Sequence, residues 1–203
     1  VVYDMESAGV PIHHKRLHTT LRTFKKKKAL TEVSLSHVAR QHRLCTAPNT
    51  RWNPNSTQQL SQLLYGKPRG LGFPILSRTA GGAPSVNAGT LDLLQNHAVT
   101  PARRKTLALL GELRNSDSAI RYLQSYSDLA VPSPCGKFSL LYPSFWIVGT
   151  ATTRFSSSNP NLQNVSTQDD QPLRAVFGPR PGTFWYDIDY DSLELRIFAH
   201  AAK

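Results

Sequence analysis

The chain has 203 residues, of which 39% are hydrophobic, and 24 Lys and Arg against 13 Asp and Glu give it a formal charge of +11. This length and apolar content argue against intrinsic disorder and allow one large or two small domains, while no apolar run approaches the ~20 residues that a membrane span requires. The basic excess favours a polyanionic partner such as nucleic acid, a property shared with ribosomal, chromatin and membrane-surface proteins.

The cysteines and the two ends of the chain narrow the class of protein further. Cys45 and Cys135 belong to no CxxC or Cys/His cluster, so we expect both to serve as small apolar residues in a soluble protein of a reducing compartment. The amino end lacks the charged-then-apolar layout of a signal peptide, and the sequence ends in AHAAK, inside an apolar helical pattern. We therefore expect a piece of a longer protein.

A long helix is predicted from Lys15 to about Arg40. The prediction rests on residues that recur at spacings of three and four and so form one stripe along a helix: Leu17, Leu21, Phe24, Lys28, Thr31, Leu35 and Val38. Because Lys28 and Thr31 interrupt the stripe beside the run Lys25, Lys26, Lys27 and Lys28, we expect the middle of the helix to leave the core. The four lysines then project toward phosphate or form an ordinary solvated face.

Three further helices and a loop are predicted up to residue 126. Residues 41–55 read as a connection, and STQQLSQLLYG has an N-capping serine and a terminal glycine around a short helix. Residues 67–87, rich in Pro and Gly and ending in TAGGAPSVN, form a loop whose backbone can approach a ligand closely. A short helix follows at 90–95, and Thr100 with Pro101 begins a long helix to Tyr126. The cations at 103–105 oppose its dipole and suggest an outside anion.

The last third changes to aromatic and β-branched residues. Two strands in a hairpin-like pair are predicted within 137–155, and TFWYDID is predicted to form a strand from residue 183 to 189. If that strand continued, Asp187, Asp189 and Asp191 would share one face. A helix follows in SLELRIFAHAA, so Asp189 lies where a strand gives way to a helix, a common place for metal-binding carboxylates.

These motifs resemble a known family. TATTRFSSSNPNLQN and DIDYDSLELRIFAH resemble the region before motif A, and motif A itself, of the family A DNA polymerases, which include bacterial polymerase I and related phage enzymes. VVYDMESAGVPI, STQQLSQLLYG and TAGGAPS resemble the segments that lead into and build the thumb, so the resemblance covers essentially the whole chain. The sequence departs from the family at Thr153, Asp187, Asp191 and Ser192.

The resemblance implies an α+β fold: a helical thumb and the start of the antiparallel-sheet palm of a right-hand polymerase. Residues 1–12 would enter the palm, 13–126 would form the thumb, and 127–203 would form the first part of the palm, including motif A. It also implies a cytoplasmic protein of a bacterial cell or phage-infected host, with primer–template DNA and dNTPs as partners and no membrane.

For motif A the resemblance implies two-metal nucleotidyl transfer of dNTPs to a primer 3′ hydroxyl. Asp189 and the backbone carbonyl of Tyr190 would bind two Mg²⁺ ions, which clamp the attacking and leaving oxygens of the in-line displacement. Glu194 would close the catalytic site against a ribose 2′ hydroxyl and so select deoxynucleotides. Without the resemblance, Asp189 could be a solvent-facing carboxylate, and Asp191 with Glu194 could be a capping box.

Upstream, the resemblance implies contacts with the primer–template. Arg154, Asn161, Gln163 and Asn164 match positions that touch the duplex near its paired end, where amides and a guanidinium can read minor-groove acceptors common to all base pairs. Taken alone, NPNLQN could be a turn whose amides satisfy its own backbone. Arg174 would lie near the template or incoming nucleotide. The lysine run and TAGGAPSVN would meet duplex phosphates.

The family's fingers helix and second palm aspartate are not found in the sequence. One carboxylate cannot hold both metals, so we expect this chain alone not to polymerise DNA, and a second chain carrying the fingers and remaining palm is a possible partner. Two alternatives remain: a non-catalytic duplex-binding module derived from a polymerase thumb, and an unrelated basic nucleic-acid binder.

Overall fold

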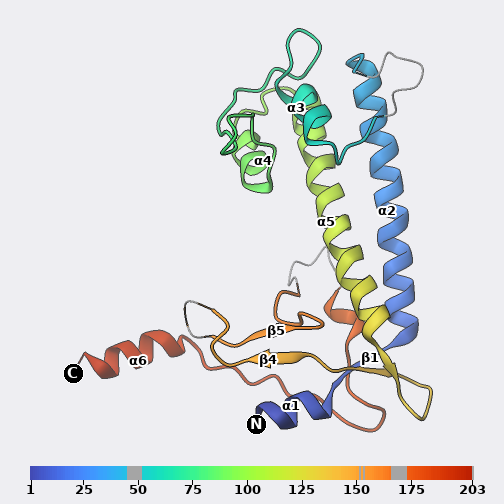
Figure 1. Cartoon of the computed structure of the whole chain (residues 1–203), viewed down its shortest axis with the longest axis vertical. Coiled ribbons are helices and arrows are strands. Elements are labelled where there is room, and N and C mark those ends of the chain that lie inside the picture. The colour runs from blue at the N-terminus through green and yellow to red at the C-terminus, as the bar shows by residue number, and fades with distance from the viewer. Residues whose placement is uncertain (45–51, 151, 153, 166–172, 203) are drawn as a thin grey trace.

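Figure 1 shows the computed structural model, which describes residues 1–44, 52–150, 152, 154–165 and 173–202. These residues form an α+β structure of helices and two small antiparallel sheets. In chain order the elements are α1 (Val2–Ala8), β1 (Val10–Ile12), α2 (His14–Gln41), α3 (Thr57–Tyr65), α4 (Ala88–Gln95), α5 (Pro101–Leu129), β2 (Val131–Pro132), β3 (Ser139–Leu141), β4 (Ser144–Trp146), β5 (Ser156–Ser158), the 3-10 helix η1 (Arg174–Val176) and α6 (Leu193–Ala201).

The long helices α2 and α5 run side by side in opposite directions and connect the two ends of the molecule (Figure 1). The helix predicted from Lys15 to Arg40 is therefore confirmed, with its apolar stripe turned toward α5. The expectation that its middle leaves the core is wrong. Thr31 is buried and donates to Glu112 Oε2 at 3.0 Å, and Lys28 Nζ lies 2.6 Å from Asp117 Oδ1. Acidic residues on α5 allow this polar section of α2 to pack.

Two hydrophobic clusters lie at opposite ends of this helix pair. The first joins the end of α2 and the beginning of α5 to α3, α4 and the 67–87 loop, through residues such as Leu35, Leu63, Phe73, Leu94 and Leu110. The second joins the other ends of α2 and α5 to β1, β3 and η1, through residues such as Ile12, Leu21, Leu123, Leu141 and Val176. The helix pair thus fixes the position of the sheet region relative to α3 and α4.

The predicted N-caps Ser56 and Thr100 form as expected, and Asn87 caps a helix for which no cap is predicted. The Ser56 hydroxyl accepts from the Gln59 N–H at 3.4 Å, the Asn87 side chain caps α4, and the Thr100 hydroxyl accepts from the Arg103 N–H at 3.3 Å. The fifth helix extends three residues beyond the predicted Tyr126. Each capping residue lies next to its helix in the chain, so the local sequence is enough to predict where these helices begin.

Two of the three first-turn cations of α5, Arg103 and Arg104, bind carbonyls of the chain and so do not by themselves indicate an outside anion. Arg103 donates to the carbonyls of Leu71 and Gly72 at 2.9 and 3.2 Å, and Arg104 donates to those of Ala98 and Val99 at 3.1 and 3.2 Å. Chain carbonyls therefore satisfy both guanidinium groups, which hold the neighbouring loops onto α5.

The two strands predicted as a hairpin within 137–155 form, but they belong to different sheets. β3 pairs with β1 and β2 in the order β1-β3-β2, whereas β4 pairs with β5. All pairings are antiparallel. Both edges of β3 are occupied by strands from elsewhere in the chain, so neither is left for β4.

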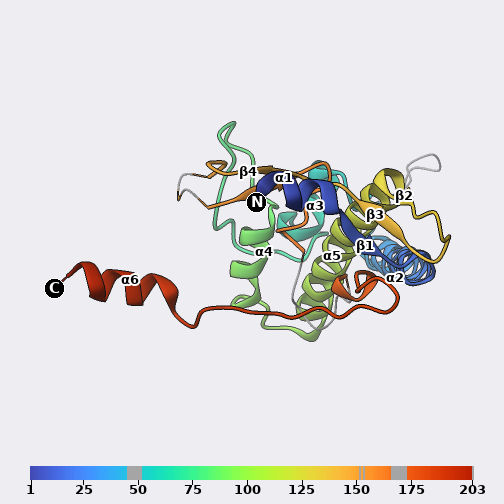
Figure 2. The ribbon, with the colours of Figure 1, turned by 90° about the horizontal axis from the view of Figure 1, so that it is seen from below.

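The strand predicted for residues 183–189 is not formed. The segment is extended and exposed, with Ile188 87% accessible, and no strand of the described residues pairs with it. A strand is stabilised by a neighbouring ladder, and this one lacks a neighbour among those residues. The helix after it is confirmed, beginning at Leu193. In both views α6 extends away from the helix pair and the sheets (Figure 2).

Two remaining expectations concern the cysteines and the membrane. Cys135 is exposed, and its thiol lies 3.1 Å from the Ser133 hydroxyl. The prediction that it serves as a small apolar residue is therefore wrong. Cys45 and part of the 41–55 connection lie outside the described residues, as does the polar stretch 166–172. None of the described helices is both long enough and apolar enough to cross a membrane.

Candidate active site and duplex-binding surface

Asp189 and Tyr190 lie in the extended segment between Gly182 and α6, and both side chains are exposed. A carboxylate and a backbone carbonyl are oxygen donors of the kind Mg²⁺ prefers, and Mg²⁺ commonly takes one or two protein carboxylates together with water and substrate phosphate. Within the part of the chain that the structure describes, no group of three or more His, Cys, Asp or Glu converges on a metal position. The donor type fits the ion, so Asp189 is chemically able to supply one ligand of such a set.

Glu194 lies in the first turn of α6, and its alternative role in a capping box with Asp191 is not observed. The N-cap is Ser192, in the left-handed region at φ 52°, and its side chain makes no capping hydrogen bond. Asp191 Oδ1 instead accepts from the Ser192 hydroxyl at 3.1 Å, and the Asp191 carbonyl accepts from Arg196 Nε at 2.8 Å. The carboxylate of Glu194 accepts from the Arg154 guanidinium.

Arg154 therefore meets Glu194, forty residues later in the chain, in an ion pair. The backbone of Arg154 is held by Thr150, whose hydroxyl accepts from the Arg154 N–H at 3.0 Å and donates to the Arg154 carbonyl at 3.3 Å. The side chains of Arg154 and Glu194 are 68% and 79% exposed. The sequence assigned these two residues to different ligands and did not predict that they would bind each other. Thr153, the departure beside Arg154, lies outside the described residues.

The NPNLQN segment forms a turn that partly satisfies its own backbone. Asn161 Oδ1 accepts from the N–H groups of Gln163 and Asn164, each at 3.1 Å, and the Ser157 hydroxyl accepts from the Leu162 N–H at 3.0 Å. Asn161 thus has a structural role, which the sequence left open. The side chains of Gln163 and Asn164 are exposed, and no side-chain hydrogen bond of either is found among the described residues. Their amides are therefore presented to solvent.

Arg174 begins η1 and borders a cavity of about 320 Å³ beside the second hydrophobic cluster. Apolar side chains form most of the wall, including Phe145, Phe177 and Trp185. The cavity brings Arg174 together with the extended segment that carries Asp189, since Trp185 belongs to that segment. A basic group thus lies in the same cavity wall as one residue of the extended segment.

The four predicted lysines divide into two pairs. Lys27 Nζ lies 3.1 Å from Glu112 Oε1, and Lys28 lies between Asp117 and Glu32, so these two are engaged within the helix pair. Hydrogen bonding to Asp117 raises the pKa of Lys28, against a smaller opposing effect of burial. Lys25 and Lys26 are exposed, and no ion pair of either is present among the described residues.

Residues 79–83 of the TAGGAPSVN segment form a narrow exposed turn, whereas Ser85 and Val86 are buried. The Thr79 N–H donates to the Ala83 carbonyl at 2.8 Å, and Arg78 donates to the Gly82 carbonyl at 2.7 Å. A Cβ at Gly81 or Gly82 would meet no atom within 4 Å, and Gly82 has φ +81°. The loop therefore presents open backbone that another molecule can approach.

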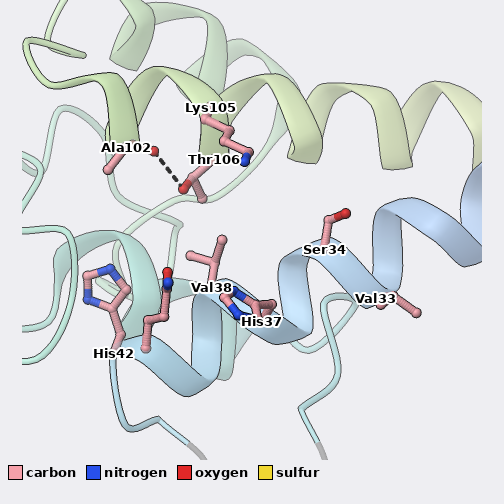
Figure 3. Close-up of a pocket in the computed structure, with 9 residues that line it drawn as sticks. Val33, Ser34, His37, Val38, His42, Ala102, Lys105 and Thr106 are labelled. Atoms are coloured by element: carbon pink, nitrogen blue, oxygen red, sulfur yellow. Dashed lines mark hydrogen bonds between the residues drawn. The ribbon is translucent and has the colours of Figure 1, made fainter.

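The sequence did not predict the groove between the end of α2 and the start of α5. Figure 3 shows this cavity of about 410 Å³, with Val38, His37 and His42 from α2 and its C-terminal cap on one side and Lys105 and Thr106 from α5 on the other. His42 Nδ1 donates to the Arg69 carbonyl at 2.7 Å, and the Thr106 hydroxyl donates to the Ala102 carbonyl at 2.9 Å. Both polar contacts serve local structure. The groove's position depends on helix packing, for which the sequence offers no local signal.

Comparisons with known proteins match almost the whole chain. Residues 22–203 match the sequence model of DNA polymerase family A. DNA polymerase I of Chloroflexus aurantiacus is 31% identical over 98% of this chain and 20% of that protein, and DNA polymerase I of Caldicellulosiruptor bescii is 29% identical over 100% and 22%. The chain thus spans about a fifth of the length of these relatives.

The fold is similar to that of the POL domain of Pol1 from M. smegmatis, solved in complex with DNA primer-template and dNTP. The TM-score is 0.72 at 22% identity, over 98% of this chain and 32% of that one.

Proposed function

Because the chain belongs to DNA polymerase family A, we propose that it is a portion of a DNA-directed DNA polymerase that grips a primer–template duplex and supplies one aspartate for nucleotidyl transfer. The observation that carries this proposal is the family match over residues 22–203, which includes the upstream turn, Asp189 and Glu194. In this assignment residues 1–12 enter the palm, 13–126 form the thumb and 127–203 form the first part of the palm.

Asp189 and the Tyr190 carbonyl would hold Mg²⁺ in this proposal. When bound, two such ions stabilise the attacking and leaving oxygens of an in-line phosphoryl displacement. The exposed carboxylate of Asp189 is free of intramolecular ion pairs among the described residues, which leaves its oxygens open to a cation. Arg174 lies beside the same segment and would attract the template or the nucleotide phosphates.

Glu194 would select deoxynucleotides. Its position in the first turn of α6, five residues after Asp189, would keep it near a nucleotide bound at the aspartate's metal. A carboxylate close to the sugar would exclude a 2′ hydroxyl by its volume. The selection would therefore lower the apparent affinity for ribonucleotides rather than for deoxynucleotides.

The duplex would be held by charge and by exposed amides. The formal charge of +11, the exposed Lys25 and Lys26 and the open TAGGAPSVN backbone favour contact with phosphates, which is independent of sequence. The exposed amides of Gln163 and Asn164 would read minor-groove acceptors. Lys27 and Lys28 would contribute less, because acidic residues of α5 already neutralise them.

We also propose that the chain does not extend a primer alone. Two metal ions require more carboxylate ligands than the described residues bring together. A second chain carrying the fingers and the remaining palm would complete the site. The same observation supports one alternative, a non-catalytic duplex-binding module, which would leave Asp189 without a role.

Fluorescence anisotropy of a labelled primer–template with the purified chain tests the duplex-binding proposal. We expect binding that does not depend on base sequence, and log K that falls linearly with log salt. Replacing both Lys25 and Lys26 by Gln should reduce that slope, and replacing both Lys27 and Lys28 by Gln, which removes the same charge from residues that acidic side chains of α5 already neutralise, should reduce it less. Absence of duplex binding at low salt would refute the proposal.

A further inference from the structure

The Arg154–Glu194 ion pair joins two groups that the proposed function assigns to different ligands. Arg154 is the guanidinium expected to meet the primer–template, and Glu194 is the carboxylate expected to meet the nucleotide sugar. In the DNA-free chain the Arg154 guanidinium and the Glu194 carboxylate bind each other instead. The Glu194 carboxylate occupies Nη2 of the Arg154 guanidinium, so a DNA acceptor that binds this nitrogen has to displace the carboxylate from it.

The neighbouring contacts keep the two groups facing each other. Two hydrogen bonds with the Thr150 hydroxyl fix the backbone of Arg154. On the other side, Arg196 donates to the Asp191 carbonyl and so orders the chain where it enters α6. No residue of α6 is buried, so little else attaches this helix to the sheet region in the described structure. The ion pair therefore also acts as a tether for α6.

We propose that Glu194 is an internal competitor for Arg154: it holds the guanidinium while DNA is absent, and primer–template displaces it. This inference rests on the proposed function, because it requires that Arg154 contact the duplex. Displacement would release the Glu194 carboxylate at the moment when the duplex arrives, and with it the tether on α6. Arg154 would thus be a positioning residue for Glu194, and duplex binding would make the carboxylate available to the nucleotide.

The size of the competition follows from the exposure of the pair. Ion pairs between exposed side chains stabilise a protein weakly. Because the duplex has to break this pair before it binds Arg154, the pair should lower duplex affinity only about twofold to fivefold. Neutralising Glu194 should recover that factor. Any acid removed near DNA would also raise affinity through net charge, so a matched variant is required.

Asp191 supplies that control. It lies three residues before Glu194, carries the same charge, and its carboxylate accepts from Ser192 rather than from a cation in the described structure. We would measure primer–template affinity by anisotropy for the unchanged chain, Glu194→Gln, Asp191→Asn, Arg154→Gln and the double variant Arg154→Gln/Glu194→Gln. All three substituted positions are exposed, and circular dichroism would verify the fold of each variant.

We expect Glu194→Gln to bind the duplex about twofold to fivefold more tightly than Asp191→Asn, and we expect this gain to vanish in the Arg154→Gln background. Hydrogen exchange at α6 should rise when DNA is added to the unchanged chain and should already be raised in Glu194→Gln. Equal affinities for Glu194→Gln and Asp191→Asn, or a gain that survives without Arg154, would overturn the inference while leaving duplex binding intact. If the unchanged chain binds no duplex, the proposed function fails and this inference fails with it.

Discussion

Tyr126 is the largest fully buried side chain of the described residues, and it connects the end of α5 to the candidate duplex-reading turn. Its hydroxyl donates to the Asn161 carbonyl at 3.2 Å, and its ring meets the Phe177 ring edge-on at a centroid distance of 5.4 Å. A buried hydroxyl requires a partner, and this partner is the backbone of the turn. One side chain thereby ties the helix pair to the NPNLQN segment.

Replacing Tyr126 by Phe should remove this link without leaving a large cavity. We expect the free energy of unfolding to fall by about 1 kcal/mol, because the Asn161 carbonyl loses a hydrogen-bond donor. Urea denaturation measures the change. Tyr122→Phe is the control, since Tyr122 is only partly buried, and it should cost less. An equal effect of both variants would show that the Asn161 contact contributes nothing.

The same residue predicts a loss of stability in alkali. Burial raises the pKa of Tyr126 to about 12, with a smaller contribution from Tyr122, and burial also raises that of Tyr65. Unfolded tyrosine ionises near pH 10, so the folded state is favoured fully below that pH and loses this stability as pH rises toward 12. Unfolding measured between pH 8 and 11 should show the decline. Tyr126→Phe should flatten it, and a pH-independent unfolding free energy would contradict the assignment.

At the scale of the elements, the polar contacts between α2 and α5 fix how the two helices pack. Lys28 bonds Asp117 across the helix pair at 2.6 Å and approaches Glu32 on its own helix at 3.8 Å. Thr31 and Lys27 both contact Glu112. These contacts replace apolar packing in the middle of the interface, between the two hydrophobic clusters.

Asp117→Asn should destabilise the chain more than Glu32→Gln, although both remove one negative charge beside the same lysine. We expect a loss of about 1 kcal/mol for Asp117→Asn and less than about 0.5 kcal/mol for Glu32→Gln, because the shorter contact is a hydrogen-bonded pair between helices. Chemical denaturation of both variants gives the comparison. The reverse order would mean that the contact across the interface is dispensable.

The difference between local and distant contacts explains what the sequence predicted. The helices were found because caps such as Ser56 and Thr100 and the stripe from Leu17 to Leu35 lie close together in the chain. The pairing of β3 with β1 joins residues 10–12 to 139–141, which no local pattern encodes. In the site, motif A and the upstream turn were found by their resemblance to a family. The Arg154–Glu194 pair was missed because it forms only when two distant segments meet.

At the scale of the whole molecule, the segment from residue 184 to α6 leaves a large apolar surface open to solvent. Its exposed residues include Phe184, Tyr186, Ile188, Ile197 and Phe198. An exposed apolar surface of this extent commonly marks an interaction site. In the proposed function, the rest of the palm would cover it.

Replacing Ile188 and Phe198 together by Ser should lower binding of a hydrophobic dye and lower concentration-dependent self-association. The melting temperature should remain nearly unchanged, because both side chains are exposed. By contrast, Leu123→Ala should lower the melting temperature, because Leu123 is buried, and should cost about 2–5 kcal/mol of unfolding free energy. Sedimentation and dye fluorescence follow the first effect. A marked fall in melting temperature of the double Ser variant would show that the segment packs against the body.

The most direct test of the catalytic role is primer extension by a chimera in which residues 1–203 replace the matching segment of the Chloroflexus aurantiacus DNA polymerase I. We expect Mg²⁺-dependent product from the chimera and a loss of at least about a thousandfold in Asp189→Ala, with primer–template binding retained. The Asp187→Asn chimera, which lacks a neighbouring charge on the same segment, should make far more product than the Asp189→Ala chimera. A folded chimera that binds duplex yet makes no product, or an Asp189→Ala chimera as active as its parent, would overturn the proposed catalytic role.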